Sequence, residues 1–255
     1  MTHQLLLSLT SGAFIAGAAA YLGTVMLSKK MAIVAGPLGH LALPGAALAL
    51  VYGFSISLGA FPFVVAGIVL IWLLEIRTKL QMEALTAIVF ATGVAAAFLF
   101  LPINKAEAAL VGDISKVGIA ATIATSVLST IVFVVVRLCY PEIMLMSIHE
   151  DLAKAEGVRV KLYNLIYLSA IAIIVALGVS LVGGLMTAAL VAIPAAAARN
   201  FSRTLTQYGF AAGAFGVISA MVGIFVAAYS GLPAGPLVIL TSAAIFAVSV
   251  PVAKI

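Results

Sequence analysis

The chain has 255 residues, of which 65% are hydrophobic and only 8% are charged. A soluble domain is nearer half apolar and a quarter charged, so this composition excludes an ordinary water-soluble fold and favours a protein covered by lipid. The net charge of +5 does not indicate a nucleic-acid partner, because the basic residues gather in short segments between apolar stretches.

Nine apolar stretches follow one another along the chain. A helix that crosses the hydrocarbon core needs roughly 20 mostly apolar residues, and these stretches do not alternate as barrel strands would. They are 5–27, 31–52, 55–74, 83–101, 117–140, 162–182, 184–198, 207–229 and 236–253. The seventh is short and is expected to be re-entrant or broken. We therefore predict an all-α, polytopic transmembrane bundle of about nine spans (eight to ten), forming one domain over residues 1–255.

Basic residues are distributed asymmetrically between the two sides of this bundle. If the N-terminus is outside, only Lys105 and Lys116 lie outside with it. The other eleven lysines and arginines then lie in the cytoplasm: Lys29, Lys30, Arg77, Lys79, Arg137, Lys154, Arg159, Lys161, Arg199, Arg203 and Lys254. Because basic residues favour cytoplasmic loops, we predict a cell-membrane protein with an external N-terminus and a cytoplasmic C-terminus.

The second stretch contains an irregular segment. Its glycines and prolines are Gly36, Pro37, Gly39, Pro44 and Gly45. Pro44 has no N–H for the carbonyl of His40, so we expect a broken helix with His40 beside an unpaired acceptor. Broken backbone and an ionisable residue at mid-span depth are typical of transport pathways. A neutral histidine bonded to a neighbouring helix is the alternative. Pro194 predicts a similar break in the seventh stretch.

The predicted cytoplasmic loop 141–161 is the most polar part of the chain and contains a short helix. Ser147 and Glu150 predict a capping box, and Glu150 with Asp151 places negative charge on the first turn. Gly157 predicts a left-handed stop. An apolar stripe is formed by Ile148, Leu152 and Ala155. Two interpretations remain open: the helix docks to a cytoplasmic partner, or it lies against the bilayer or other loops.

Several classes of function lack their motifs in this sequence. There is no GK[ST] phosphate loop, no HExxH pair and no convincing nucleophile with a base, so we expect neither nucleotide binding nor catalysis by this chain. The single cysteine, Cys139, excludes an internal disulfide and a cysteine cluster for zinc. An ATP-independent channel or secondary transporter is an alternative, although the paired inverted repeats and buried carboxylates common in secondary transporters are not evident.

Taken together, four segments resemble the permeases of ABC importers for zinc, manganese and iron. They are the segment Gly36–Gly45 with its histidine, the loop helix from Ser147 to Ala153 with Gly157, the run from Gly183 to Arg199, and Gly231–Pro236. The resemblance covers roughly residues 29–112 and 147–252. It implies a homodimer of permeases, two cytoplasmic ABC ATPases and an external metal-binding protein that delivers the ion.

The resemblance also implies roles for individual residues. His40 would contact the transported metal, which is a cargo and not a bound cofactor. The backbone of the pathway would include Gly36, Gly39, Pro44, Gly45 and Pro194. The coupling helix would present Glu150, Asp151, Leu152, Ala153 and Gly157 to the ATPase. The family usually has aspartate at the position of Gly36, and imidazole without carboxylate leans toward zinc over manganese. A permease of the same fold for another small cargo is the alternative.

Overall fold

The computed structural model describes residues 2–29, 39–78, 80, 82–100, 109–110 and 117–252. Over these ranges the regular elements are all helical and no strand occurs, so the prediction of an all-α protein is confirmed. The named elements are α1 (Thr2–Ser28), α3 (Leu43–Tyr52), α4 (Ile56–Thr78), α5 (Met82–Phe100), α7 (Ile119–Leu138), α8 (Tyr140–Ile148), α9 (Glu150–Ala155), α10 (Val160–Phe201), α11 (Leu205–Ser230), α12 (Ala234–Ser249) and the 3-10 turn η2 (Val250–Val252).

The predicted count of nine spans is not confirmed. In the described part of the chain, six helical segments are long and apolar enough to cross a membrane: His3–Ser28, Ile56–Leu74, Ile119–Leu138, Val160–Gly184, Leu205–Ser230 and Ala234–Val252. Three further apolar helices are shorter: Gly39–Tyr52, Ala84–Leu99 and Met186–Phe201. The first two fall within predicted stretches, and the third extends three residues beyond the stretch 184–198. A helix of 10–17 residues rises only about 15–25 Å, less than the hydrocarbon thickness.

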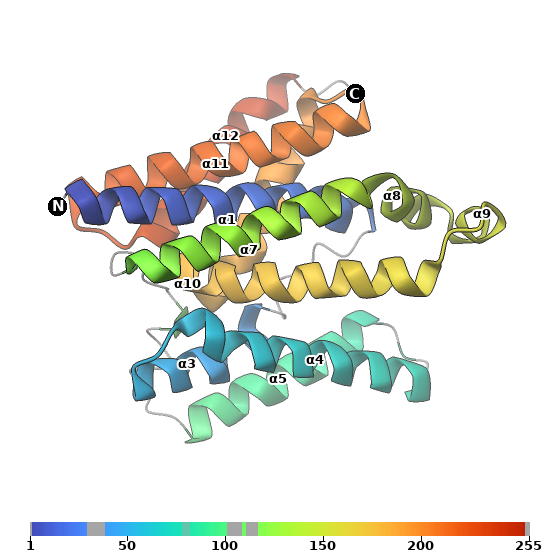
Figure 1. Cartoon of the computed structure of the whole chain (residues 1–255), viewed down its shortest axis with the longest axis horizontal. Helices are drawn as coiled ribbons and strands as arrows, with labels where there is room; N and C mark the ends of the chain where they lie inside the picture. Colours follow the sequence, from blue (N-terminus) through green and yellow to red (C-terminus); the bar gives the residue numbers. More distant parts are fainter. Residues whose placement is uncertain are drawn as a thin grey trace.

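Two helices form the centre of the bundle. α1 packs on α11, α10 and α7, while α10 also packs on α12, α11 and α4. Figure 1 shows α3, α4 and α5 as a layer on one side of α10, with α11 and α12 on the other side. The central helices bury most of their apolar surface inside the protein, whereas α7 and α12 leave most of theirs for lipid. This placement makes α10 the element that connects both sides of the molecule.

Polar side chains join the helices within the apolar bundle. The Ser11 hydroxyl of α1 donates to Thr122 Oγ1 of α7 at 3.2 Å. Thr24, near the other end of α1, shares a 3.0 Å hydrogen bond with the Tyr140 hydroxyl of α8. Hydrogen bonds of this kind hold helices together in lipid, where apolar burial gives little preference for one neighbour over another. They hold α1 against α7 and α8, the two helices that precede α9.

Candidate functional site

His40 lies in a helical turn that precedes α3. The turn covers residues 39–41, and α3 begins at Leu43 with Pro44 in its first turn. A proline is well tolerated there, because the N–H that it lacks would have had no partner within the helix. In the described part of the segment, the predicted interruption is therefore a single turn residue, Ala42. The Ala46 N–H bonds to the Ala42 carbonyl at 2.8 Å as α3 begins.

The His40 imidazole is partly buried and stacks on Phe90 of α5, with ring centroids 4.9 Å apart and the planes tilted by 39°. Its Nδ1 atom is buried and has no hydrogen-bond partner among the described residues. Buried polar atoms without a partner are uncommon, because each carries the cost of lost hydration. Within the described residues, this nitrogen therefore makes no hydrogen bond to a neighbouring helix.

The described residues do not contain a complete metal-binding cluster within this single chain. No group of three or more His, Cys, Asp or Glu side chains comes together in them. Gly36, another predicted pathway residue, lies outside the described residues. Within the described residues, His40 therefore does not form a three-ligand metal site with other side chains of the same chain.

The turn that carries His40 packs directly on the middle of α10. A Cβ atom on Gly39 would lie 2.6 Å from the Gly184 carbonyl oxygen and 3.1 Å from Thr187 Cβ. The reverse contact is equally close, because a Cβ on Gly184 would lie 2.9 Å from the Gly39 oxygen. Real Cβ atoms are essentially never found below 3.0 Å, so only glycine fits on both sides. The prediction that Gly39 belongs to a special backbone region is consistent with this contact.

α10 is broken at Gly183 and not at Pro194. Gly183 has φ 79° and ψ 167°, a combination that is essentially restricted to glycine. The Thr187 hydroxyl donates to the Gly183 carbonyl at 2.7 Å, across the first turn after the break. Pro194 lies within the second half of α10, where the helical dihedrals continue. The predicted break at Pro194 was therefore wrong, whereas the Gly183-Gly184 dipeptide was a turn signal that could have located it.

Gly45, another predicted pathway residue, joins two helices. Its Cβ position would overlap the Gly59 carbonyl, and that of Gly59 would overlap the Gly45 carbonyl. α3 and α4 therefore approach through their backbones, as small residues permit in membrane proteins. In this structure Gly45 has a packing role, while His40 stacks on α5 and its neighbour Gly39 contacts α10.

The predicted coupling helix exists as α9, but it begins differently from the prediction. Ser147 belongs to α8, where its hydroxyl donates to the Ile143 carbonyl at 2.6 Å, so the capping box was wrong. His149 occupies the N-cap without a side-chain bond. The end agrees with the sequence: Gly157 has φ 78°, and the Val158 N–H returns to the Ala153 carbonyl at 2.9 Å.

The exposed and buried sides of α9 differ sharply. Leu152 is 49% exposed and Ile148, at the end of α8, is 61% exposed, whereas Ala153 is fully buried. Lys154 pairs with Glu150 at 2.8 Å and with Asp151 at 3.5 Å. The hydrogen bond and charge of Glu150 raise the pKa of Lys154 above its ordinary value. A partner docking on this side would meet two apolar side chains beside a charged network, but it could not touch Ala153.

The ABC 3 transport family matches residues 1–253, almost the whole chain. The chain belongs to the ABC 3 transport family. The manganese import system permease protein ScaB of Streptococcus parasanguinis is 24% identical over 231 residues, covering 89% of this chain and 82% of the relative. The high-affinity zinc uptake system membrane protein ZnuB of Haemophilus influenzae is 27% identical over 249 residues, covering 95% of each protein.

A solved structure confirms the fold of this ABC 3 family member. PsaBC from Streptococcus pneumoniae in complex with Fab superposes with a TM-score of 0.85 at 22% sequence identity. The match covers 97% of this chain and 91% of that chain. The likeness shows that the helices described above share the fold of that chain.

Proposed function

We propose that this ABC 3 family chain is the permease subunit of an ATP-driven importer and that its cargo is a transition-metal ion. The observation that carries the proposal is the His40 imidazole, whose buried Nδ1 has no partner among the described residues and whose turn packs on the break in α10. Imidazole nitrogen is a ligand for zinc, iron, copper and nickel. The relatives named as manganese and zinc permeases support a metal cargo.

A pathway at the interface of two copies would supply a second imidazole. A single nitrogen ligand from each protomer binds an ion more weakly than a closed site of four ligands, which suits an ion that must be released. We propose that the chain, as one permease domain over residues 1–255, works as a homodimer with two cytoplasmic ATPases and an external delivery protein. Gly36, Gly39, Pro44 and Gly45 are proposed as pathway backbone, with Gly39 supported most directly by its contact with Gly184. Pro194 is left out of this proposal, because α10 continues through it.

Uptake of radioactive zinc and manganese by the reconstituted importer tests the role of His40. His40→Ala should lower uptake by about tenfold or more, since no other ligand of the chain replaces the imidazole. His40→Gln keeps a polar side chain but loses the imidazole, so it should be nearly as damaging. The exposed His3→Ala is the matched control and should leave uptake unchanged. Normal uptake by His40→Ala would overturn the metal-contact role, and transport of another solute in its place would favour the alternative cargo.

The coupling loop 141–161 is proposed to transmit the conformational change of the ATPase to the permease through α9. The exposed pair Ile148 and Leu152 supports this proposal, with the Glu150 and Asp151 carboxylates beside them. Leu152→Glu should weaken co-purification of the ATPase and abolish uptake while membrane insertion persists. Glu156→Gln, just beyond the same helix, is the control. If Leu152→Glu leaves both ATPase binding and uptake intact, the apolar side chains face the bilayer or another loop.

We also propose an external N-terminus and a cytoplasmic C-terminus, based on the asymmetry of basic residues. In a Cys139→Ser background, single cysteines at Ser230 and Lys154 should react with an impermeant maleimide from opposite sides of the membrane. Both positions are exposed and lie at the ends of described elements. Labelling of both from the same side would overturn this topology.

A further inference from the structure

Lys29, the first residue after α1, reaches across to α10. Its Nζ donates to the Asn164 Oδ1 at 2.9 Å and lies 4.7 Å from the centroid of the Tyr167 ring. Tyr167 is only 1% exposed, so this ring forms a rigid, buried platform. A cation over an aromatic face is attracted by the ring, and the attraction grows as water is removed. Lys29 therefore ties the end of α1 to the first part of α10, in addition to contributing a cytoplasmic charge.

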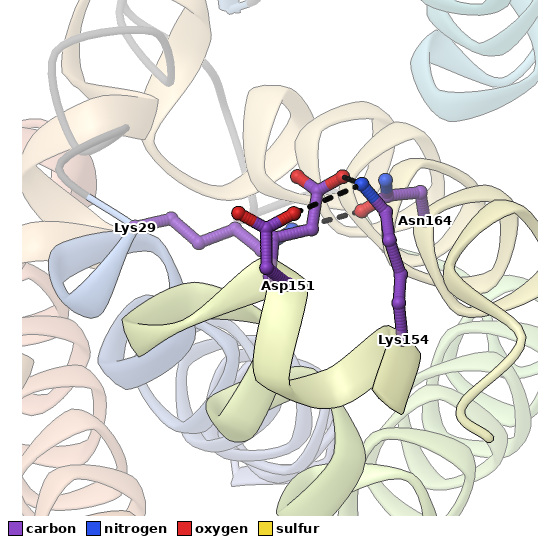
Figure 2. Close-up of polar contacts among 5 residues, drawn as sticks. Lys29, Asp151, Lys154 and Asn164 are labelled. Carbon is purple, nitrogen blue, oxygen red and sulfur yellow. Dashed lines mark hydrogen bonds and ion pairs between the residues drawn. The ribbon is translucent and has the colours of Figure 1, made fainter. Parts of the chain in front are cut away.

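The charge of α9 also acts on the same ammonium. Figure 2 shows Lys29 extending to Asn164 and, in the same region, Lys154 paired with the carboxylate of Asp151. Burial lowers the pKa of Lys29, and the negative charge of Glu150 opposes that shift. Glu150 forms its direct ion pair with Lys154 and acts on Lys29 at longer range. The charge of Lys29 is thus sensitive to where α9 lies.

The contacts of Lys29 lead toward the proposed pathway along α10. Asn164 and Tyr167 lie near the start of this helix, and its break at Gly183 and Gly184 packs on Gly39 beside His40. The α9 helix makes few contacts of its own with α10, and it is attached to the bundle mainly through α8. Lys29 therefore joins α1 to α10 by direct contacts and responds at longer range to the charge of Glu150 on α9.

We propose that Lys29 is a positioning residue that transmits a displacement of α9 to α1 and α10, and so sets how much ATP is hydrolysed for each ion imported. This inference rests on the proposed function, because α9 is taken as the contact for the ATPase. When α9 shifts, the attraction between its carboxylates and the half-buried ammonium changes, and the bond to Asn164 and the contact with Tyr167 must adjust. Without the ammonium, α9 would act on α10 only through the backbone of residues 156–159 and their few contacts.

The ratio of ATP hydrolysed to metal imported in the reconstituted complex tests the proposal. Lys29→Met keeps much of the apolar stem and removes the charge. It should lower zinc or manganese uptake by about fivefold or more, the range of a typical coupling between sites, while ATP hydrolysis stays near the wild-type rate. Lys29→Arg keeps a cation over Tyr167 and should restore part of the coupling. Lys161→Met, an exposed lysine at the same end of the protein, is the matched control.

Two further variants separate transmission from simple structural support. Asn164→Leu leaves Lys29 in place but removes its accepting oxygen, and it should shift the ratio in the same direction. Glu150→Gln should shift the ratio as well, and its effect should shrink in the Lys29→Met background, because interacting residues are non-additive.

The possible results distinguish a failure of the Lys29 proposal from a failure of the proposed metal cargo. An unchanged ratio in Lys29→Met, or a parallel loss of hydrolysis, assembly and uptake in both Lys29→Met and Asn164→Leu, would overturn the transmission role. A wild-type complex that binds the ATPase but imports neither metal would instead count against the proposed cargo.

Discussion

Two interruptions of the apolar helices meet near the proposed pathway, and they arise in different ways. The one before α3 lies in a segment rich in glycine and proline, yet Pro44 fits in the first turn of α3 with little disturbance. The one in α10 has no proline: Gly183 adopts φ 79° and ψ 167°, while Pro194 remains within the helix. The comparison teaches that proline marks where a membrane helix can begin or bend, whereas a glycine dihedral decides where this one breaks.

The two interruptions also depend on each other. Gly39 and Gly184 touch through their backbones, so neither segment can move closer to the other. Because one segment carries His40 and the other belongs to the central helix, this contact joins the proposed ligand to the core of the bundle. Substitutions at Gly39, at Gly183 and at Pro194 should therefore have effects of different size on stability and uptake. The order of these effects tests the comparison.

The largest effect is expected for Gly39→Val. Its Cβ would lie 2.6 Å from the Gly184 carbonyl oxygen, and backbone atoms cannot move aside as a flexible side chain can. We expect a loss of about 3 kcal/mol or more in stability and uptake near background. Thermal unfolding of the purified protein and metal uptake measure the two effects. Gly118→Ala, where a Cβ would meet nothing within 4 Å, is the control. A tolerated valine would mean that the two segments separate easily.

Gly183→Ala should have the next largest effect. Alanine at φ 79° and ψ 167° costs about 1–3 kcal/mol, and relief of this strain would straighten α10 and displace the contact with Gly39. Gly53→Ala provides a comparison, because Gly53 also has a positive φ but lies in open space at the end of α3. Gly53→Ala should lower thermal stability without reducing uptake, whereas Gly183→Ala should reduce both. Equal uptake by the two variants would show that the turn in α10 has no role in transport.

Thr187→Val should have a smaller effect. It removes the hydroxyl that donates to the Gly183 carbonyl at 2.7 Å and should cost about 1 kcal/mol. Thr241→Val removes a bond of the same kind, from Thr241 to the Leu237 carbonyl at 2.8 Å, in the regular helix α12. Stability should fall in both, but uptake should fall only in Thr187→Val. A similar loss of uptake in both variants would argue that the hydroxyl at the break has no special importance.

The smallest effect is expected for Pro194→Ala. The helix already continues through this position, so alanine would restore one backbone hydrogen bond and stabilise the protein by about 1 kcal/mol or less. Uptake should change by less than about twofold. A strong loss of uptake would restore Pro194 to the role that the sequence suggested, and it would show that the pathway needs the carbonyl left free by this proline.

The candidate site was only partly predictable from the sequence. His40 stood out because an ionisable residue within an apolar stretch is costly, and its unpartnered Nδ1 is consistent with that expectation. Its stacking on Phe90 and the contact between Gly39 and Gly184 could not be predicted, since these residues are far apart in the chain. In the coupling loop, the end at Gly157 followed from its local backbone preference, whereas Ser147 had two competing bonds and joined α8 instead.

The sequence by itself determined the features that depend on composition and local pattern. Sparse charge and long apolar stretches require a helical protein in lipid, because each helix satisfies its own backbone bonds there. Only the tertiary structure decided which stretches become full-length spans, where α10 breaks and what Lys29 binds. These outcomes depend on which helices lie side by side, and in lipid that choice follows from close packing of small residues and scattered polar bonds, which local sequence does not specify.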